Sequence, residues 1–260
     1  MTAINSNRAI DKSFLLIAIG NSRIHCAWLK NNRIGSIWDV KHISKEADLK
    51  QILADLPDAM SARQKSTDIV AVIASVVPEQ AELWRHYSNA RFLTLKNIGL
   101  RNIYSTLGID RALAVWGGGE TYGYPCLVID GGTALTFTGV NQHQELVGGA
   151  ILPGLRSQFT TLKQKTAALP QVDLPKSLPL RWATDTEKAI ASGIIHTTIA
   201  GIYSYVTDWQ KQYSSSSIIL TGGDGEILTQ YLWQQYPELK SSLKSDRNLI
   251  FYGMKLAIVE

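Results

Sequence analysis

Two stretches of the chain share one pattern of apolar and polar positions. Residues 15–29 (LLIAIGNSRIHCAWL) and 126–140 (CLVIDGGTALTFTGV) each run from an apolar segment, through a turn of glycine and a hydroxyl residue, into a second apolar segment. A short apolar, β-branched run that ends at glycine is typical of a buried strand. Each stretch therefore predicts a hairpin, and the pair predicts an internal duplication.

The rest of the chain alternates short strands with helices. In the first half we expect strands at 14–19, 23–29, 34–40, 69–75 and 91–95, and helices at 45–56, 78–87 and 110–122. In the second half we expect strands at 126–129, 134–140, 145–152, 218–221 and 249–252, helices at 155–168, 184–210 and 225–235, and a short helix at the end. The repeated order predicts an α/β fold with two halves, residues 1–123 and 124–260.

Two local features of the predicted helices matter later. The glycines at 117–119 weaken the second half of helix 110–122, and they permit either close packing or a bend. In helix 184–210, Thr184 and Glu187 have the spacing of a capping box.

Composition narrows the functional classes. The chain is 45% hydrophobic and 18% charged, which is ordinary for a globular protein and excludes a disordered one. The basic residues behind the net charge of +4 are scattered, so we expect no nucleic-acid partner. We see no signal peptide and no apolar run of membrane-spanning length, and therefore expect a cytoplasmic protein without a membrane partner. Cys26 and Cys126 lie in predicted strands and are expected to be buried thiols.

The two turns suggest a phosphate site. A glycine turn with a Ser or Thr points backbone N–H groups and a hydroxyl out of a strand end, which suits an anionic phosphate. Two such turns together could bind a polyphosphate. A third segment, residues 218–225 (IILTGGDG), ends on glycines that would let the backbone approach a nucleoside closely.

Asp130 ends a predicted buried strand directly before Gly131, Gly132 and Thr133, so its carboxylate should face the turn. A hard oxygen ligand at a phosphate site suits Mg²⁺ or a monovalent cation, and the Thr133 hydroxyl would contact phosphate. The alternative is that Asp130 caps its own turn.

Residues 108–111 (GIDR) begin a predicted helix, where free N–H groups and partial positive charge attract an anion. Arg111 would bind a carboxylate in bidentate fashion, and Asp110 would accept a proton from a substrate hydroxyl. The alternative is a helix cap or a surface ion pair. Thr186, in the first turn of helix 184–210, is either a further ligand contact or a solvated threonine.

Together these segments resemble the type III pantothenate kinases, members of the superfamily of actin, hexokinase and heat-shock-chaperone ATPases. IGNSR resembles the family's first phosphate loop, Tyr104 followed by GIDR its substrate motif, and DGGTALT its second phosphate loop. Residues 148–170 and 184–194 resemble two further family blocks. The five motifs occur in the family's order over nearly the whole chain.

The resemblance implies two duplicated ribonuclease H-like (actin-like ATPase) domains around a central cleft. It implies ATP-dependent phosphorylation of the primary hydroxyl of pantothenate to 4′-phosphopantothenate, the first step of coenzyme A biosynthesis. Mg²⁺ and a monovalent cation (K⁺ or NH₄⁺) would be required. A homodimer is also implied, and the long helix of the second half is a candidate interface.

The resemblance also implies a role for each matching residue. Asp110 would be the general base, and Asp130 would bind the monovalent cation. The ATP contacts would be Ala18, Ile19, Gly20, Asn21, Ser22, Arg23, Ile24, His25 and Thr133. The pantothenate site would be formed by Tyr104, Gly108, Ile109, Asp110, Arg111 and Thr186.

The chain departs from the family pattern at two acidic positions. Ala18 stands where an Asp usually precedes the first loop, and Thr138 stands where an acidic residue is common. The interval from Tyr104 to Gly108 is also shorter than in many members. In a working kinase without the first carboxylate, Mg²⁺ would be held by ATP oxygens, water and Asp130.

Two rival functions remain. One is a catalytically impaired, nucleotide-binding homologue that acts as a regulatory accessory factor, for which Ala18 is the main support. The other is a related sugar or acetate kinase. Retention of Asp110, Arg111, Asp130, Thr133 and Thr186 favours the pantothenate kinase.

Overall fold

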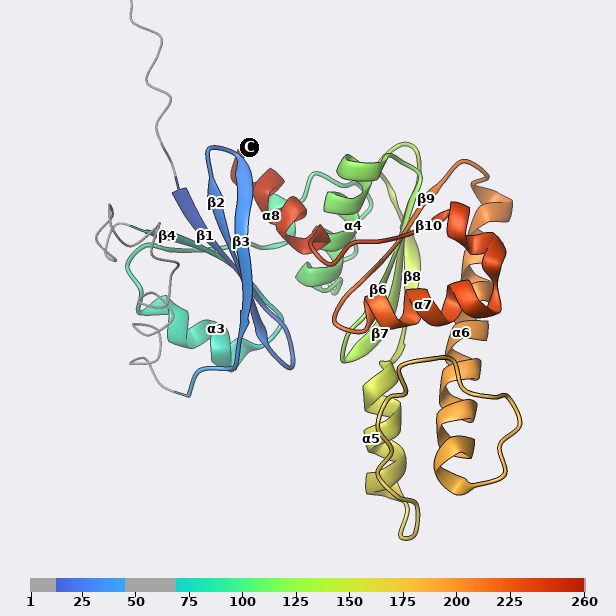
Figure 1. Cartoon of the computed structure of the whole chain (residues 1–260). Helices are drawn as coiled ribbons and strands as arrows, with labels where there is room; N and C mark the ends of the chain where they lie inside the picture. The colour runs from blue at the N-terminus through green and yellow to red at the C-terminus, as the bar shows by residue number, and fades with distance from the viewer. Residues whose placement is uncertain (1–12, 45–68, 260) are drawn as a thin grey trace, which may run out of the picture. The chain divides into compact units, whose positions relative to one another are not determined.

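The computed structural model describes residues 13–44 and 69–259 (Figure 1). The chain divides into two compact units: the first has its described residues in 13–44, 69–96 and 258–259, and the second spans residues 97–257. The predicted helix at 45–56 lies outside the described residues. The boundary predicted between residues 123 and 124 follows the sequence repeat and stays a prediction. In the structure, residues 97–123 belong to the second compact unit.

The first unit is built on a five-stranded mixed sheet in the order β3-β2-β1-β4-β5. Its strands are β1 (Ser13–Ile19), β2 (Ile24–Lys30), β3 (Arg33–Val40), β4 (Val70–Ser75) and β5 (Ala90–Phe92). The strands β1, β2 and β3 form an antiparallel meander, and β4 and β5 continue the sheet in parallel. Helix α3 (Pro78–Arg85) covers the sheet with the fully buried Trp84.

The second unit contains a sheet with the same strand order and directions, β8-β7-β6-β9-β10. Its strands are β6 (Cys126–Gly131), β7 (Ala134–Val140), β8 (Leu146–Pro153), β9 (Ser217–Thr221) and β10 (Leu243–Ser245). The two hairpins predicted from the repeated pattern are therefore confirmed, and each opens one of the two sheets.

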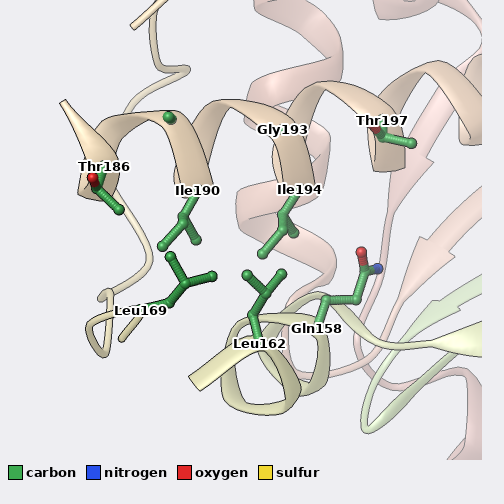
Figure 2. A pocket seen from close by; sticks show the side chains of 9 residues that line it. Gln158, Leu162, Leu169, Thr186, Ile190, Gly193, Ile194 and Thr197 are labelled. Carbon is green, nitrogen blue, oxygen red and sulfur yellow. The ribbon is translucent and has the colours of Figure 1, made fainter. Parts of the chain in front are cut away.

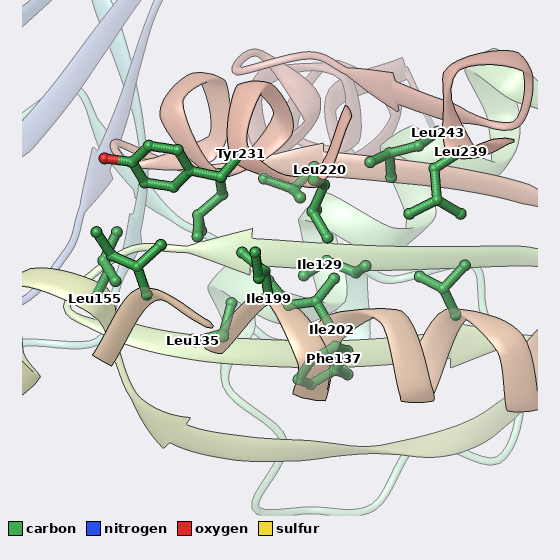
Figure 3. Packing of buried hydrophobic residues seen from close by; sticks show 14 of the residues in the cluster. Ile129, Leu135, Phe137, Leu155, Ile199, Ile202, Leu220, Tyr231, Leu239 and Leu243 are labelled. Atoms are coloured by element: carbon green, nitrogen blue, oxygen red, sulfur yellow. The ribbon is translucent and has the colours of Figure 1, made fainter. Parts of the chain in front are cut away.

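Helices cover both faces of the second sheet. They are α4 (Ile109–Tyr122), α5 (Leu155–Lys165), α6 (Thr186–Gln212) and α7 (Gly225–Gln235). Helix α8 (Leu249–Val259) packs against α4, and short 3₁₀ turns lie at Leu95–Asn97 and Pro237–Ser241. Side chains alternate along β6 and so face different helices. Ile129 (Figure 3) and Leu127 join the core with α6 and α7, whereas Cys126 and Val128 face α4.

The three glycines of α4 serve close packing rather than a bend, because the helix runs unbroken past them. A Cβ at Gly117 would stand 2.5 Å from the backbone N of Gly253 in α8, and one at Gly118 would stand 3.0 Å from Val128. At Gly119 a Cβ would clash with the ring of Tyr124. Larger residues at these positions would push α4 away from its neighbours.

Two sequence predictions about local structure are wrong. Residues 249–252, expected as a strand, form the first turn of α8, because a short apolar run does not distinguish a buried helix from a strand. The predicted capping box is also absent: the Asp185 side chain accepts a hydrogen bond from the backbone N–H of Lys188 (2.9 Å), so α6 begins at Thr186. Strand β10 was missed since it is only three residues long.

Helix α6 has the length and hydropathy of a membrane-spanning helix, contrary to the expectation that no apolar stretch reaches that length. Apolar side chains of α6 are buried inside the protein, and this burial explains its composition. Ile195, Ile199, Ile202 and Val206 are fully buried in the core of the second unit. The helix therefore uses these side chains to pack in a protein core.

The two cysteines are free and buried, as predicted. Burial raises the pKa of each thiol, Cys26 and Cys126, to about 12. Both are therefore uncharged at neutral pH and unsuited to nucleophilic chemistry.

Candidate functional site

The GIDR motif forms the beginning of α4. Gly108 is the N-cap residue with an extended backbone. A Cβ at this position would lie 2.5 Å from Asp110 Oδ1, so a larger residue would displace this carboxylate. Asp110 is half-buried and accepts a hydrogen bond from the backbone N–H of Arg111 at 2.8 Å. Its Oδ1 thus stabilises the first turn of α4, in partial agreement with the predicted capping alternative. The N-cap residue itself is Gly108 and not Asp110.

Burial raises the pKa of Asp110, while the backbone N–H and the guanidinium of Arg111 oppose this shift. A carboxylate with a raised pKa is a stronger base than an ordinary one near neutral pH. Asp110 therefore has the chemistry needed to accept a proton from an alcohol.

The guanidinium of Arg111 lies in a tight set of hydrogen bonds. Its Nε donates to Thr138 Oγ1 at 3.1 Å, Nη1 to Tyr104 Oη at 3.2 Å and Nη2 to the Phe137 carbonyl at 3.0 Å. Arg111 is only 8% exposed, whereas Tyr104 is 44% exposed. Two residues predicted for the pantothenate site, Tyr104 and Arg111, therefore lie in direct contact, and the alternative of a surface ion pair is wrong for Arg111.

Asp130 lies at the end of β6 beside the glycine turn that follows β9. Gly222 has a φ of 87°, and a Cβ there would overlap with Asp130 Oδ1, so this turn needs glycine for two reasons. Burial and the nearby Asp110 carboxylate raise the pKa of Asp130 to about 7. The two predicted carboxylates therefore lie within electrostatic reach of each other in the second unit.

The second phosphate loop is held by the first turn of α5. The backbone N–H of Gly154 and the hydroxyl of Ser157 both donate to the Thr133 carbonyl, at 2.9 and 2.7 Å. The Thr133 side chain itself is exposed. Its hydroxyl can therefore face a ligand from a loop whose backbone is fixed.

An ion pair beside this loop was missed by sequence reasoning. Arg156 Nε donates to Asp224 Oδ1 at 2.7 Å, and the backbone N–H of Asp224 donates to the Gly131 carbonyl at 2.8 Å. The Asp224 carboxylate is buried while most of the Arg156 side chain is exposed. The sequence offered only a weak signal: Arg156 lies in the family block of residues 148–170, and Asp224 lies in the glycine segment of residues 218–225.

The first phosphate loop lies in the first unit, between β1 and β2. Ala18 and Ile19 end β1, and the backbone N–H of Gly20 donates to the Arg23 carbonyl at 3.0 Å to close the turn. Arg23 and His25 both contact the Asp39 carboxylate, at 3.8 and 2.7 Å. Asp39 was not predicted as part of the loop, since only the register of β2 with β3 places it beside His25.

Thr186 lies in a different part of the second unit from the Arg111 cluster. It lines an apolar pocket of about 510 Å³ between α5 and α6, with Leu162, Ile190 and Ile194 (Figure 2). None of the residues that line this pocket belongs to the GIDR motif. Within one chain, the structure therefore does not bring Thr186 to the other predicted substrate residues.

The donor set fits a magnesium ion that also binds phosphate. In the part of the chain that the structure describes, no group of three or more His, Cys, Asp or Glu side chains could hold a metal alone. Magnesium at phosphoryl-transfer sites usually takes one or two carboxylates and completes its shell with phosphates and water. Asp130, at the end of β6, supplies one such carboxylate.

Comparisons with known proteins identify the family of the chain. The family model described as type III pantothenate kinase matches residues 14–208. A type III pantothenate kinase from Synechocystis sp. is 46% identical over 245 residues, covering 94% of this chain and 89% of that protein. One from Nostoc sp. is 41% identical over 278 residues and covers 99% of both chains.

Solved structures show the same fold at low identity. The crystal structure of a putative Baf family transcriptional activator from Campylobacter jejuni has a TM-score of 0.61 at 24% identity and covers 95% of this chain and 98% of its own. A putative 2-dehydro-3-deoxygalactonokinase from Sinorhizobium meliloti has a TM-score of 0.59 at 13% identity, over 94% and 95%. With its family model and its curated relatives in agreement, the chain belongs to the type III pantothenate kinase family.

Proposed function

We propose that this chain is a working pantothenate kinase, which transfers the γ-phosphoryl group of ATP to the primary hydroxyl of pantothenate. The observation that carries this proposal is that the first turn of α4 holds a half-buried carboxylate, Asp110, next to a buried guanidinium, Arg111. The regulatory alternative rests on Ala18, and membership of the kinase family gives it no support. As part of the proposal, the enzyme acts in the cytoplasm on small molecules, without a nucleic-acid or membrane partner.

In this proposal each residue of the α4 cluster has one task. Arg111 binds the carboxylate of pantothenate, with Tyr104, Gly108 and Ile109 around it, and so places the primary hydroxyl at Asp110. As the hydroxyl oxygen forms its bond to the γ-phosphorus, the bond from that phosphorus to the β-phosphate oxygen breaks and ADP leaves. The hydroxyl proton passes to Asp110.

ATP is assigned to the two glycine turns. Residues 18–25 and Thr133 would donate backbone N–H groups and hydroxyls to the phosphates, as anion-binding turns of this kind do. Asp130 would hold the monovalent cation and would be the protein carboxylate near Mg²⁺, whose other ligands would be ATP oxygens and water. The cations neutralise charge on the phosphates during transfer. The shared strand order of the two sheets supports the further inference that they are duplicated ribonuclease H-like domains.

A homodimer is part of the proposal because of where Thr186 lies. This residue is assigned to the pantothenate site, yet it lines the pocket between α5 and α6 and not the Arg111 cluster. A second copy that packs along α6 could supply its own Thr186 to the site. Sedimentation of the full chain should therefore give twice the mass of 28.7 kDa.

A coupled ADP-release assay tests the proposed function. We expect turnover that depends on pantothenate in K⁺ buffer and is lower in Na⁺ buffer. Phosphate transfer to a sugar or to acetate instead would favour a related kinase. ATP binding without any pantothenate-dependent turnover would favour the regulatory alternative and reject the enzyme.

The raised pKa of Asp130 predicts that cation activation depends on pH. With its pKa near 7, this carboxyl is largely protonated at pH 6 and largely ionised at pH 8, and only the ionised form attracts a cation. The K⁺ concentration for half-maximal activity should therefore be about tenfold higher at pH 6 than at pH 8. K⁺ titrations of the activity at the two pH values measure this shift.

The raised pKa of Asp130 also predicts how the stability of the cation-free protein depends on pH. Because the folded pKa lies above that of an unfolded Asp, its contribution to stability is present at acidic pH and is lost as pH rises to about 7. Asp130→Asn should remove both this loss of stability with rising pH and the pH dependence of K⁺ activation. Equal K⁺ requirements of the unmodified enzyme at pH 6 and pH 8 would rule out Asp130 as the cation ligand.

Restoring the carboxylate at position 18 tests how the metal is held. Ala18 is only 2% exposed, so Ala18→Asp should cost about 1–3 kcal/mol of stability in the absence of metal. We expect it to lower the Mg²⁺ concentration for half-maximal activity, because it adds a hard oxygen ligand. Ala18→Asn is the matched uncharged control. The same Mg²⁺ dependence in both variants would show that the native site needs no further carboxylate.

A further inference from the structure

A side chain from outside the first phosphate loop holds the turn of that loop. His42 follows β3 in the chain, and its Nε2 lies 2.8 Å from the carbonyl oxygen of Gly20. Because a carbonyl oxygen can only accept a hydrogen bond, this ring nitrogen must carry the proton and donate it. His42 has no task in the proposed function so far.

The hydrogen bond from His42 fixes the direction of a backbone donor in the loop. The Gly20 carbonyl and the Asn21 N–H belong to one planar, trans peptide group, in which the two groups point in opposite directions. Since His42 holds the carbonyl on one side of the turn, the Asn21 N–H is directed to the other side. Asn21 and Ser22 are both exposed, so this part of the turn is open to a ligand.

The preceding peptide group of the turn is fixed by backbone atoms. The Val76 N–H donates to the Ile19 carbonyl at 3.1 Å. The Gly20 N–H donates to the Arg23 carbonyl at 3.0 Å and is therefore used within the turn. The peptide group that follows is held instead by the imidazole of His42.

The backbone beside His42 is anchored to helix α3. The side-chain amide of Gln80 binds Ile43 in both directions: its Nε2 donates to the Ile43 carbonyl at 2.8 Å, and its Oε1 accepts from the Ile43 N–H at 3.0 Å. The Ile43 side chain is 6% exposed and packs in the core of the first unit. The imidazole therefore extends from a fixed backbone, and a continuous series of contacts runs from α3 to the loop.

We propose that His42 is a positioning residue for ATP, which keeps the Asn21 N–H directed at the phosphates by holding the Gly20 carbonyl. A donor that is already oriented binds its ligand more tightly, because less freedom is lost on binding. Gln80 supports this role by fixing the backbone next to His42. The inference rests on the proposed function, because it takes the first glycine turn as a phosphate site.

Calorimetry of ATP binding in Mg²⁺ buffer tests this role, with KM for pantothenate and the thermal midpoint recorded for each variant. His42→Leu removes the donor. The Kd for ATP should rise about three- to tenfold, as for the loss of one hydrogen bond, while KM for pantothenate stays native. His42→Gln can place an N–H near the position of Nε2 and should restore tight binding. His86→Leu changes an exposed histidine of the same unit and should keep the native Kd.

Gln80 provides an independent check, which also covers the case in which His42→Leu does not fold. Gln80→Met removes both hydrogen bonds to the Ile43 backbone and should also raise the Kd for ATP. If Gln80 acts through His42, adding Gln80→Met to His42→Leu should cause no further loss of ATP binding. A further loss in the double variant would overturn the part assigned to Gln80.

A folded His42→Leu variant with the native Kd for ATP would overturn the inference, and so would a Gln variant that binds ATP no better than the Leu variant. An equal rise in KM for pantothenate would show a general structural role and would also overturn it. If His42→Leu does not fold, a native Kd in Gln80→Met has the same meaning. Failure of the proposed function would appear differently, as ATP binding without phosphate transfer to pantothenate in the unmodified protein.

Discussion

Replacing Asp110 by Asn is expected to lower kcat by about 10²- to 10⁴-fold, because the amide cannot accept the proton of the acceptor hydroxyl. The amide oxygen can still accept the hydrogen bond from the Arg111 backbone N–H, so the first turn of α4 should stay intact. ATP binding should also be preserved. Steady-state kinetics with pantothenate, together with calorimetry of ATP binding, measure these two effects separately.

Asp246→Asn is the matched control, since Asp246 accepts a hydrogen bond from the Tyr122 hydroxyl (2.7 Å) and has no assigned role in catalysis. It should keep nearly the native kcat. Substantial turnover in Asp110→Asn would remove Asp110 as the general base, even if the chain proved to be a kinase.

Replacing Arg111 by Gln is expected to raise KM for pantothenate by about 100-fold or more, while KM for ATP changes little. The reason is that a buried, hydrogen-bonded charge pair costs about 3 kcal/mol or more when one partner is truncated, and each 1.4 kcal/mol is about tenfold in affinity. Arg111→Lys should be intermediate, because one ammonium group keeps the charge but cannot reproduce the geometry of three hydrogen bonds.

Arg101 provides the control for Arg111. Its side chain is mostly exposed and lies near Glu145, so Arg101→Gln should leave both KM values nearly native. The folded state of each variant is checked by its thermal midpoint. A folded Arg111→Gln variant with the native KM for pantothenate would show that the carboxylate binds elsewhere.

The sequence predicted most of the architecture because its strongest signals are local. Each hairpin has apolar strands on both sides of a glycine turn, and this pattern is enough to predict β1–β2 and β6–β7. The failures come from signals that are weak or not local. The apolar run at 249–252 is too short to separate helix from strand, and the purpose of Gly117 becomes visible only beside α8, more than a hundred residues away in the sequence.

The candidate site also combines residues that the sequence could predict with contacts that it could not. Asp110, Arg111 and Asp130 could be proposed from motifs, since each follows directly from a strand end or a helix start. Their surroundings could not be predicted in this way. The contact of Arg111 with Thr138 depends on how α4 packs against β7, and the ion pair between Arg156 and Asp224 depends on how α5 and α7 meet at the second loop.

For Thr186, the sequence motif and the structure of a single chain point to different surroundings. Its place in a family motif predicts a substrate contact, while the structure places it beside an apolar pocket between α5 and α6. These two observations are compatible if a second copy of the chain completes the site. An interface of that kind leaves no local signal in the sequence beyond an apolar, partly exposed helix.

The most direct test of the account is a crystal structure of the full chain with a non-hydrolysable ATP analogue, Mg²⁺, K⁺ and pantothenate. We expect the pantothenate carboxylate on the Arg111 guanidinium, the primary hydroxyl within hydrogen-bond reach of Asp110, and one triphosphate in contact with both glycine turns. Pantothenate bound away from Arg111, or its hydroxyl remote from Asp110, would contradict the account.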